Sequence, residues 1–116
     1  MNPREVAILL TPADWEAFKA AAKGAEAVLF KFSPRCPISF AAEDEYREWL
    51  AGLPEGGPLR IARVDVVAQR DLSRAIAGET GVGHQSPQVI WFGPDGAVRW
   101  HASHDQVNAL RLSARR

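Results

Sequence analysis

The sequence contains one cysteine, carries no net charge and has no long hydrophobic run. A single cysteine cannot form a disulfide within the chain or a zinc centre built from several cysteines, so we expect a reducing compartment and no metal site. The 14 basic residues balance the 14 acidic residues, which argues against a nucleic-acid or membrane-surface partner. The apolar runs are too short to span a bilayer, and residues 1–5 lack the pattern of a signal peptide. Together these features predict a cytoplasmic protein.

The chain has enough hydrophobic sequence for one compact domain. Hydrophobic residues make up 47% of its 116 residues, and strand-like and helix-like patterns alternate along it. Strands are predicted at residues 6–10, 27–32, 59–67, 88–92 and 97–101. Helices are predicted after the caps Thr11 and Ser103, from Cys36, and from Asp71. This order predicts that residues 1–116 form a single α/β domain, with a central mixed β-sheet flanked by helices.

Periodic apolar residues predict which helix faces are buried. One glycine is expected to end the first helix and another to lie near the end of the third, namely Gly24 and Gly78. The side chains expected to face the core are Trp15, Phe18 and Ala22 in the first helix, Ile38, Ala42, Tyr46 and Trp49 in the second, Leu72, Ala75 and Ile76 in the third, and Val107, Leu110 and Leu112 in the last.

The single cysteine, Cys36, lies where the strand 27–32 ends and the second helix begins. Pro37 suits the first helical position, because its missing N–H would have no partner there. Cys36 is then the expected N-cap residue, and the positive end of the helix should favour its thiolate. The alternative is that this cysteine is a small buried hydrophobic residue without reactivity.

Two segments of the sequence resemble a known family. Arg-Cys-Pro-Ile-Ser at 35–39 and His-Gln-Ser-Pro-Gln at 84–88, together with Gly-Pro-Asp-Gly at 93–96, resemble the thioredoxin superfamily and more specifically its monothiol bacilliredoxin family. The resemblance implies a thioredoxin-like fold and a thiol-disulfide oxidoreductase that removes bacillithiol from mixed disulfides on client proteins. It implies no cofactor, with bacillithiol, a low-molecular-weight thiol, as co-substrate. Ser39 stands where dithiol relatives carry a second cysteine, so a dithiol cycle within one chain is impossible.

The resemblance also implies roles around the thiol. Cys36 is the expected catalytic residue, since thiolate attack on a disulfide needs only one cysteine. Pro37, Ser39 and Arg35 are expected to stabilise its thiolate through the helix start, a hydrogen bond and a positive charge. For Ser39, an ordinary polar residue in the first helical turn is an equal alternative.

Four further residues are expected to contact the substrate. Pro87 resembles the cis-proline that faces the reactive sulfur, and the Ser86 backbone could pair with a bound disulfide as a strand does. His84 could reach the sulfur or its ligand, as a pKa-lowering group or as an acid, or it could be a solvent-facing loop residue. Lys31 could attract the carboxylates of bacillithiol, or it could be a solvated charge at a strand end.

Two other functions remain open from the sequence. One is a monothiol glutaredoxin-like carrier of an iron–sulfur cluster, which also uses one cysteine at a helix start. The other is a non-catalytic interaction module with the same fold, in which Cys36 would react slowly with thiol reagents.

Overall fold

The computed structural model describes residues 6–34, 37–53 and 58–114, without the side chains of Ile38 and Ser39. Strands and helices alternate as the sequence predicts. In chain order they are β1 (Ala7–Ile8), α1 (Pro12–Ala21), β2 (Ala27–Phe32), α2 (Pro37–Ala51), β3 (Arg60–Asp65), α3 (Arg70–Thr80), β4 (Gln88–Phe92), β5 (Val98–Ser103), the short 3-10 helix η1 (His104–Gln106) and α4 (Ala109–Ser113).

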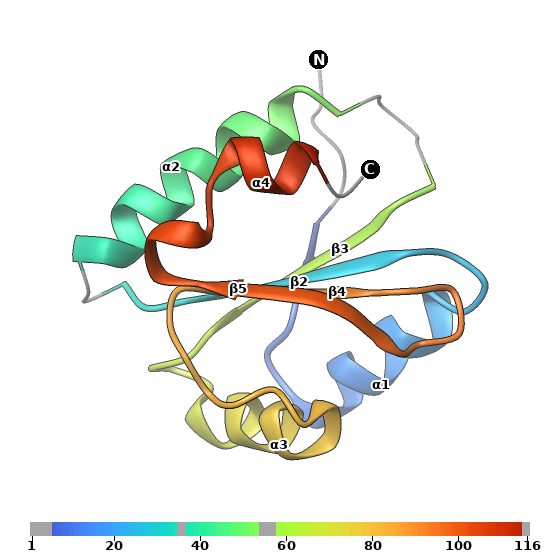
Figure 1. Ribbon diagram of the computed structural model, residues 1–116. Coiled ribbons are helices and arrows are strands. Elements are labelled where there is room, and N and C mark those ends of the chain that lie inside the picture. Colours follow the sequence, from blue (N-terminus) through green and yellow to red (C-terminus); the bar gives the residue numbers. More distant parts are fainter. Residues whose placement is uncertain (1–5, 35–36, 54–57, 115–116) are drawn as a thin grey trace.

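The five strands form one mixed sheet in the order β1-β3-β2-β4-β5. Strand β3 runs parallel to both β1 and β2, whereas β4 runs antiparallel to β2 and to β5. Helices α1 and α3 cover one face of the sheet, and α2 and α4 cover the other (Figure 1). This arrangement confirms the predicted fold class, an α/β domain with a central mixed sheet between helices. None of the helices within the described ranges is long and apolar enough to cross a membrane.

Strand β2 is buried on both faces and connects two hydrophobic cores. Its alternate side chains point to opposite sides of the sheet, so Leu29 joins the core under α1 and α3, while Val28 and Phe30 join the core under α2 and α4. All three are fully buried. The apolar run at 27–32 therefore has the central position that the sequence predicts for it.

The first helix begins as predicted. The Thr11 hydroxyl accepts a hydrogen bond from the Asp14 N–H, and the Asp14 carboxylate accepts one from the Thr11 N–H, both at 3.1 Å. This reciprocal pair is a capping box, with Pro12 at the start of the helix.

The C-terminal prediction is wrong in two respects. Ser103 ends β5 and caps no α-helix; instead, the Asn108 side chain caps α4 by accepting from the Arg111 N–H at 2.9 Å. Leu110 is 82% exposed, whereas Leu112 is buried. Residues two positions apart project from a helix in nearly opposite directions, so Leu110 and Leu112 cannot both face the sheet.

Helix α3 also differs from its prediction. Gly78 lies near its end as predicted, and the helix ends at Thr80, where Gly81 adopts a left-handed φ of 74°. Ala75 is exposed, and Ser73 takes the inward position between the buried Leu72 and Ile76. A hydroxyl is thereby buried against the sheet.

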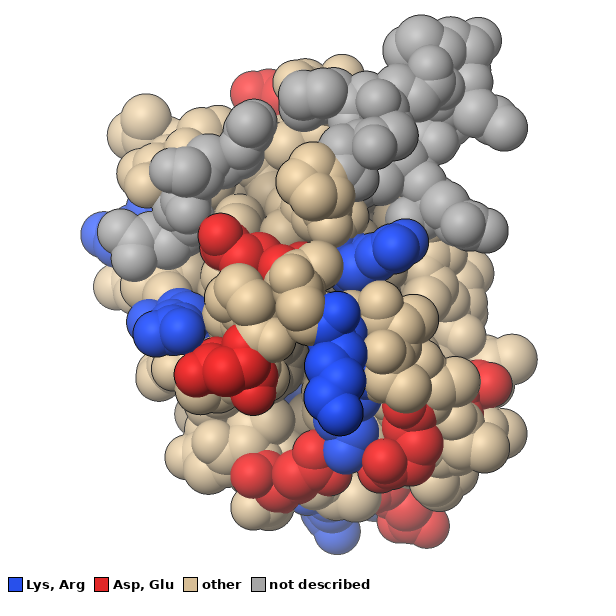
Figure 2. Space-filling view, turned by 90° about the vertical axis from the view of Figure 1, so that its right-hand side faces the viewer, with Lys and Arg blue, Asp and Glu red and all other residues tan. Residues whose placement is uncertain are grey.

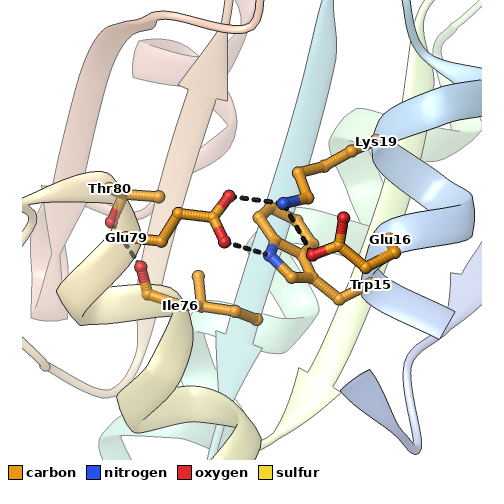
Figure 3. A network of polar contacts seen from close by, with 6 residues as sticks. All are labelled: Trp15, Glu16, Lys19, Ile76, Glu79 and Thr80. Atoms are coloured by element: carbon orange, nitrogen blue, oxygen red, sulfur yellow. Dashed lines mark hydrogen bonds and ion pairs between the residues drawn. The ribbon is translucent and has the colours of Figure 1, made fainter. Parts of the chain in front are cut away.

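A polar network joins α1 to the end of α3 (Figure 3). Glu79 accepts hydrogen bonds from the Trp15 indole at 3.2 Å and from the Lys19 ammonium at 2.6 Å, and Lys19 also pairs with Glu16 at 2.9 Å. Nearby, a pocket of about 570 Å³ opens between α1, the end of α3 and the β4–β5 turn.

Lys and Arg side chains lie close to Asp and Glu side chains on the face of the molecule shown in Figure 2.

Replacing Glu79 by glutamine should lower stability at pH 7 by about 0.5 kcal/mol, because the ion pair with Lys19 is partly exposed. The hydrogen bond from Lys19 is the main cause that lowers the pKa of Glu79. A carboxyl group whose pKa is lower in the folded state than in the unfolded state stabilises the fold at pH values above its ordinary pKa. This stabilisation is lost as the pH falls through the pKa of the folded state. Urea unfolding followed by tryptophan fluorescence should therefore show a larger difference between the two proteins at pH 7 than at pH 3. An equal difference at both values would show that the carboxylate charge has no part in it.

Candidate functional site

The strand that leads to Cys36 ends next to the strand that follows Pro87. Strands β2 and β4 are antiparallel neighbours, and their register pairs Lys31 with Gln88. Helix α2 begins at Pro37, the position predicted for this proline. Cys36 and Arg35 lie outside the described residues, so their predicted roles stay predictions.

The loop before β4 contains a cis peptide bond and makes a backbone contact with the end of β5. The Ser86–Pro87 peptide bond is cis, and Pro87 is buried. The Pro87 carbonyl accepts a hydrogen bond from the His104 N–H at 2.8 Å, which ties the loop to the end of β5. Ser86 is half-buried, and its pairing with a bound disulfide stays a prediction.

Aromatic stacking fixes α2 above the end of β2. The Tyr46 ring lies parallel to the Phe30 ring, with the ring centres 4.2 Å apart. The Arg63 guanidinium lies 4.1 Å from the centre of the Phe32 ring and forms an ion pair with Glu43 of α2 at 3.2 Å. These contacts hold the middle of α2, the helix that follows Cys36 in the sequence, against β2 and β3. Neither Arg63 nor Glu43 was predicted from the sequence to support the site.

Two ionisable side chains among these contacts, Glu43 and Tyr46, have pKa values that are shifted in opposite directions. Burial alone would raise the pKa of Glu43, but hydrogen bonds and charges from Arg47 and Arg63 outweigh it, and the pKa is lowered. Burial raises the pKa of Tyr46 above its ordinary range. At neutral pH, Glu43 is therefore ionised and the Tyr46 phenol is neutral.

Lys31 points to the other face of the sheet and is completely buried. Its ammonium donates a hydrogen bond to the Ser73 carbonyl at 3.2 Å, and burial lowers its pKa to about 8. The interpretation of Lys31 as a solvated strand-end charge is therefore wrong. The alternation of side chains along β2 turns it toward α3, which covers it. Its predicted contact with bacillithiol carboxylates stays a prediction.

The His84 ring is exposed, but it contacts Ser73, the same residue of α3 that Lys31 contacts. Its Nδ1 lies 3.2 Å from the Ser73 hydroxyl and shares a hydrogen bond with it. Partial loss of solvation is the first cause that lowers the pKa of His84, and the charges of Lys31 and Arg74 lower it further. The imidazole is therefore mainly neutral at pH 7, so it can accept or donate a hydrogen bond.

Gln88 completes this buried polar group. Its side-chain amide donates to the Gly83 carbonyl at 3.0 Å and to the Ser103 hydroxyl at 3.2 Å. Its amide oxygen is buried and has no hydrogen-bond partner in the described part of the chain. No role was predicted from the sequence for Ser73 or Gln88. Ser73 could have been noticed, because it falls on the inward face of α3 beside Leu72.

The structure brings together part of the predicted site. Lys31, His84, Ser86 and Pro87 gather around the ends of β2 and β4, with Pro37 at the start of α2. Within the described ranges, no group of three or more His, Cys, Asp or Glu residues could hold a metal ion.

Comparison with known proteins identifies the family. Residues 7–112 match the family described as monothiol bacilliredoxin BrxC. The chain belongs to the monothiol bacilliredoxin family. A solved structure described as an oxidoreductase with a thioredoxin fold is similar, with 28% identity, a TM-score of 0.79, and coverage of 94% of this chain and 91% of the other. The family match and this similar structure together identify the chain as a thiol oxidoreductase with a thioredoxin fold, that is, a redox enzyme.

More distant structures share the fold. The thioredoxin Mala s 13 of Malassezia sympodialis is 17% identical, with a TM-score of 0.74 and coverage of 99% of this chain and 91% of that one. Fasciola hepatica thioredoxin is 21% identical, with a TM-score of 0.71 and coverage of 93% of both chains. At these identities the likeness concerns the fold alone.

Proposed function

We propose that this bacilliredoxin removes bacillithiol from mixed disulfides on client proteins, with Cys36 as the attacking residue, in a reducing compartment such as the cytoplasm. The family match over residues 7–112 is the observation that carries the proposal. The start of α2 at Pro37 supports it, because Cys36 directly precedes the positive end of a 15-residue helix.

The reaction consists of two thiol–disulfide exchanges. The Cys36 thiolate attacks the bacillithiol sulfur of the mixed disulfide, a bond forms between these two sulfurs, and the client sulfur leaves as a thiolate that takes a proton from water. A second low-molecular-weight thiol then attacks the bacillithiol sulfur on Cys36. This step releases a small disulfide and regenerates the Cys36 thiolate. The second thiol is the reductant, so no internal second cysteine is needed.

The loop before β4 supplies the binding side of this proposal. The backbone at Ser86 would align the mixed disulfide, and Arg35 would attract the bacillithiol carboxylates. The neutral ring of His84 would form a hydrogen bond to the bound ligand rather than an ion pair. Clients enter as proteins modified by bacillithiol on a cysteine.

The test follows bacillithiol by intact-protein mass spectrometry. The reduced protein is mixed with a client carrying bacillithiol in a disulfide, and a matched sample uses the same client carrying glutathione. We expect one bacillithiol to move to the protein while the client appears as a free thiol, and added bacillithiol should then remove the adduct. Fast transfer from the glutathione client without transfer from the bacillithiol client would overturn the substrate assignment. Transfer from neither client would overturn the proposed exchange.

A further inference from the structure

A chain of three polar groups runs from the core to the loop before Pro87. The Lys31 ammonium donates to the Ser73 carbonyl, and the Ser73 hydroxyl shares a hydrogen bond with His84 Nδ1, each at 3.2 Å. Lys31 and Ser73 are fully buried, whereas the His84 ring is exposed. A single residue of α3 therefore connects a buried cation to an exposed imidazole.

The position of the Lys31 ammonium influences which nitrogen of the His84 imidazole carries the hydrogen. A neutral imidazole has one N–H and one lone pair, and the lone pair is the negative end of the ring dipole. Lys31 contacts the Ser73 carbonyl, and the Ser73 hydroxyl contacts the ring at Nδ1, so we take Nδ1 as the nitrogen that faces the cation. Where water is partly excluded, as at the part-buried contact between Nδ1 and Ser73, a cation favours the lone pair on the nitrogen that faces it. Nδ1 should then accept from the Ser73 hydroxyl, and the hydrogen should sit on Nε2.

We propose that Lys31 is a positioning residue, whose buried ammonium group holds His84 in the tautomer that accepts from Ser73 at Nδ1 and presents the N–H of Nε2. In the proposed thiol transfer, on which this role depends, that N–H is a donor for a sulfur or carboxylate of the bound mixed disulfide. Lys31 thus acts through Ser73 and His84, rather than by contact with the ligand as the sequence suggested.

Nitrogen NMR of the histidine side chains tests the tautomer directly in the full chain. At pH 7 the wild-type protein should show His84 with a protonated Nε2 and an unprotonated Nδ1, the assignment being made with His84→Gln. His101 and His104 serve as internal references. In Lys31→Met the His84 signals should move toward a mixture of both tautomers, and the pKa of His84 should rise. A wild-type spectrum with the hydrogen on Nδ1 would overturn the proposal without any variant.

Two matched variants separate positioning from charge alone. Among the described residues, the charges found to lower the pKa of His84 are those of Lys31 and Arg74. Arg74 is exposed, so Arg74→Gln removes a charge and leaves the chain of hydrogen bonds intact. It should raise the pKa of His84 and keep the tautomer, whereas Ser73→Ala should keep Lys31 and weaken the tautomer preference. If Lys31→Met keeps the tautomer as Arg74→Gln does, Lys31 acts only as a distant charge and the proposal fails.

The rate of bacillithiol transfer provides the second readout. Lys31→Met and His84→Gln should each slow transfer about tenfold, and the double variant should be no slower than either single variant. Additive losses would show that the two residues act independently and would contradict the proposal. The NMR readout needs no bacillithiol, so a wild-type protein that fails to transfer bacillithiol would overturn the proposed function while the tautomer result still decides the role of Lys31.

Discussion

Replacement of Cys36 by alanine is expected to lower the rate of bacillithiol transfer by at least about a thousandfold. Cys36 is the only thiol in the chain, so nothing else in this protein can form the mixed disulfide with bacillithiol. The position before Pro37 should also make this thiol react fast with alkylating reagents at neutral pH. The measurement combines the mass assay for transfer with the rate of iodoacetamide modification, both on the full chain.

Ser39→Ala is the matched control for this prediction. It changes a residue of the same helical turn and keeps the thiol, so transfer should fall by no more than about tenfold, the loss of one hydrogen bond to a thiolate. Full transfer activity in Cys36→Ala would contradict the prediction. Slow alkylation of Cys36 in the wild-type protein would instead favour the non-catalytic interaction module.

The order of elements could be predicted because each one carries its own local signal. Thr11 with Asp14 marks a helix start, and the apolar run at 27–32 marks a strand covered on both faces. Pro37 marks the start of α2 for the same local reason, the lack of an N–H where none is needed. Local sequence therefore placed the strand–helix junction of the candidate site.

The polar groups behind that junction could not be predicted in the same way. Whether Lys31 is solvated or buried depends on α3, which packs over it from more than 40 residues later in the chain. The contact of Gln88 with Ser103 likewise arises only when β4 and β5 pair. Tertiary packing decides such contacts, so a single sequence names the residues and not their partners. The prediction for the C-terminal helix was wrong for a related reason. Pairing with β4 extends β5 to Ser103, the residue that was expected to cap that helix.

Lys31 also supports a prediction about stability, which is separate from its proposed role toward His84. Lys31→Met should stabilise the fold at pH 7 by about 2 kcal/mol. Burial lowers the pKa of Lys31 from 10.5 to about 8, so the folded state holds this proton less tightly than the unfolded state does. Methionine has a similar length and needs no solvation. The Ser73 carbonyl loses one donor, but it lies inside α3 and keeps its helical partner.

The lowered pKa of Lys31 also predicts how the stability difference between the two proteins changes with pH. Below about pH 8, Lys31 is charged in both states, and the full cost of burying the charge is present. Between about pH 8 and 10.5 the folded state releases the proton first, so the wild-type protein should gain stability relative to Lys31→Met as the pH rises. Urea unfolding at pH 7, 9 and 10.5 should therefore show the difference between the two proteins shrinking. The exposed Lys23 provides the control, and Lys23→Met should change stability by no more than about 0.5 kcal/mol at any of these values. A Lys31→Met protein less stable than wild type at pH 7 would mean that the hydrogen bond to Ser73 outweighs the cost of burying the ammonium.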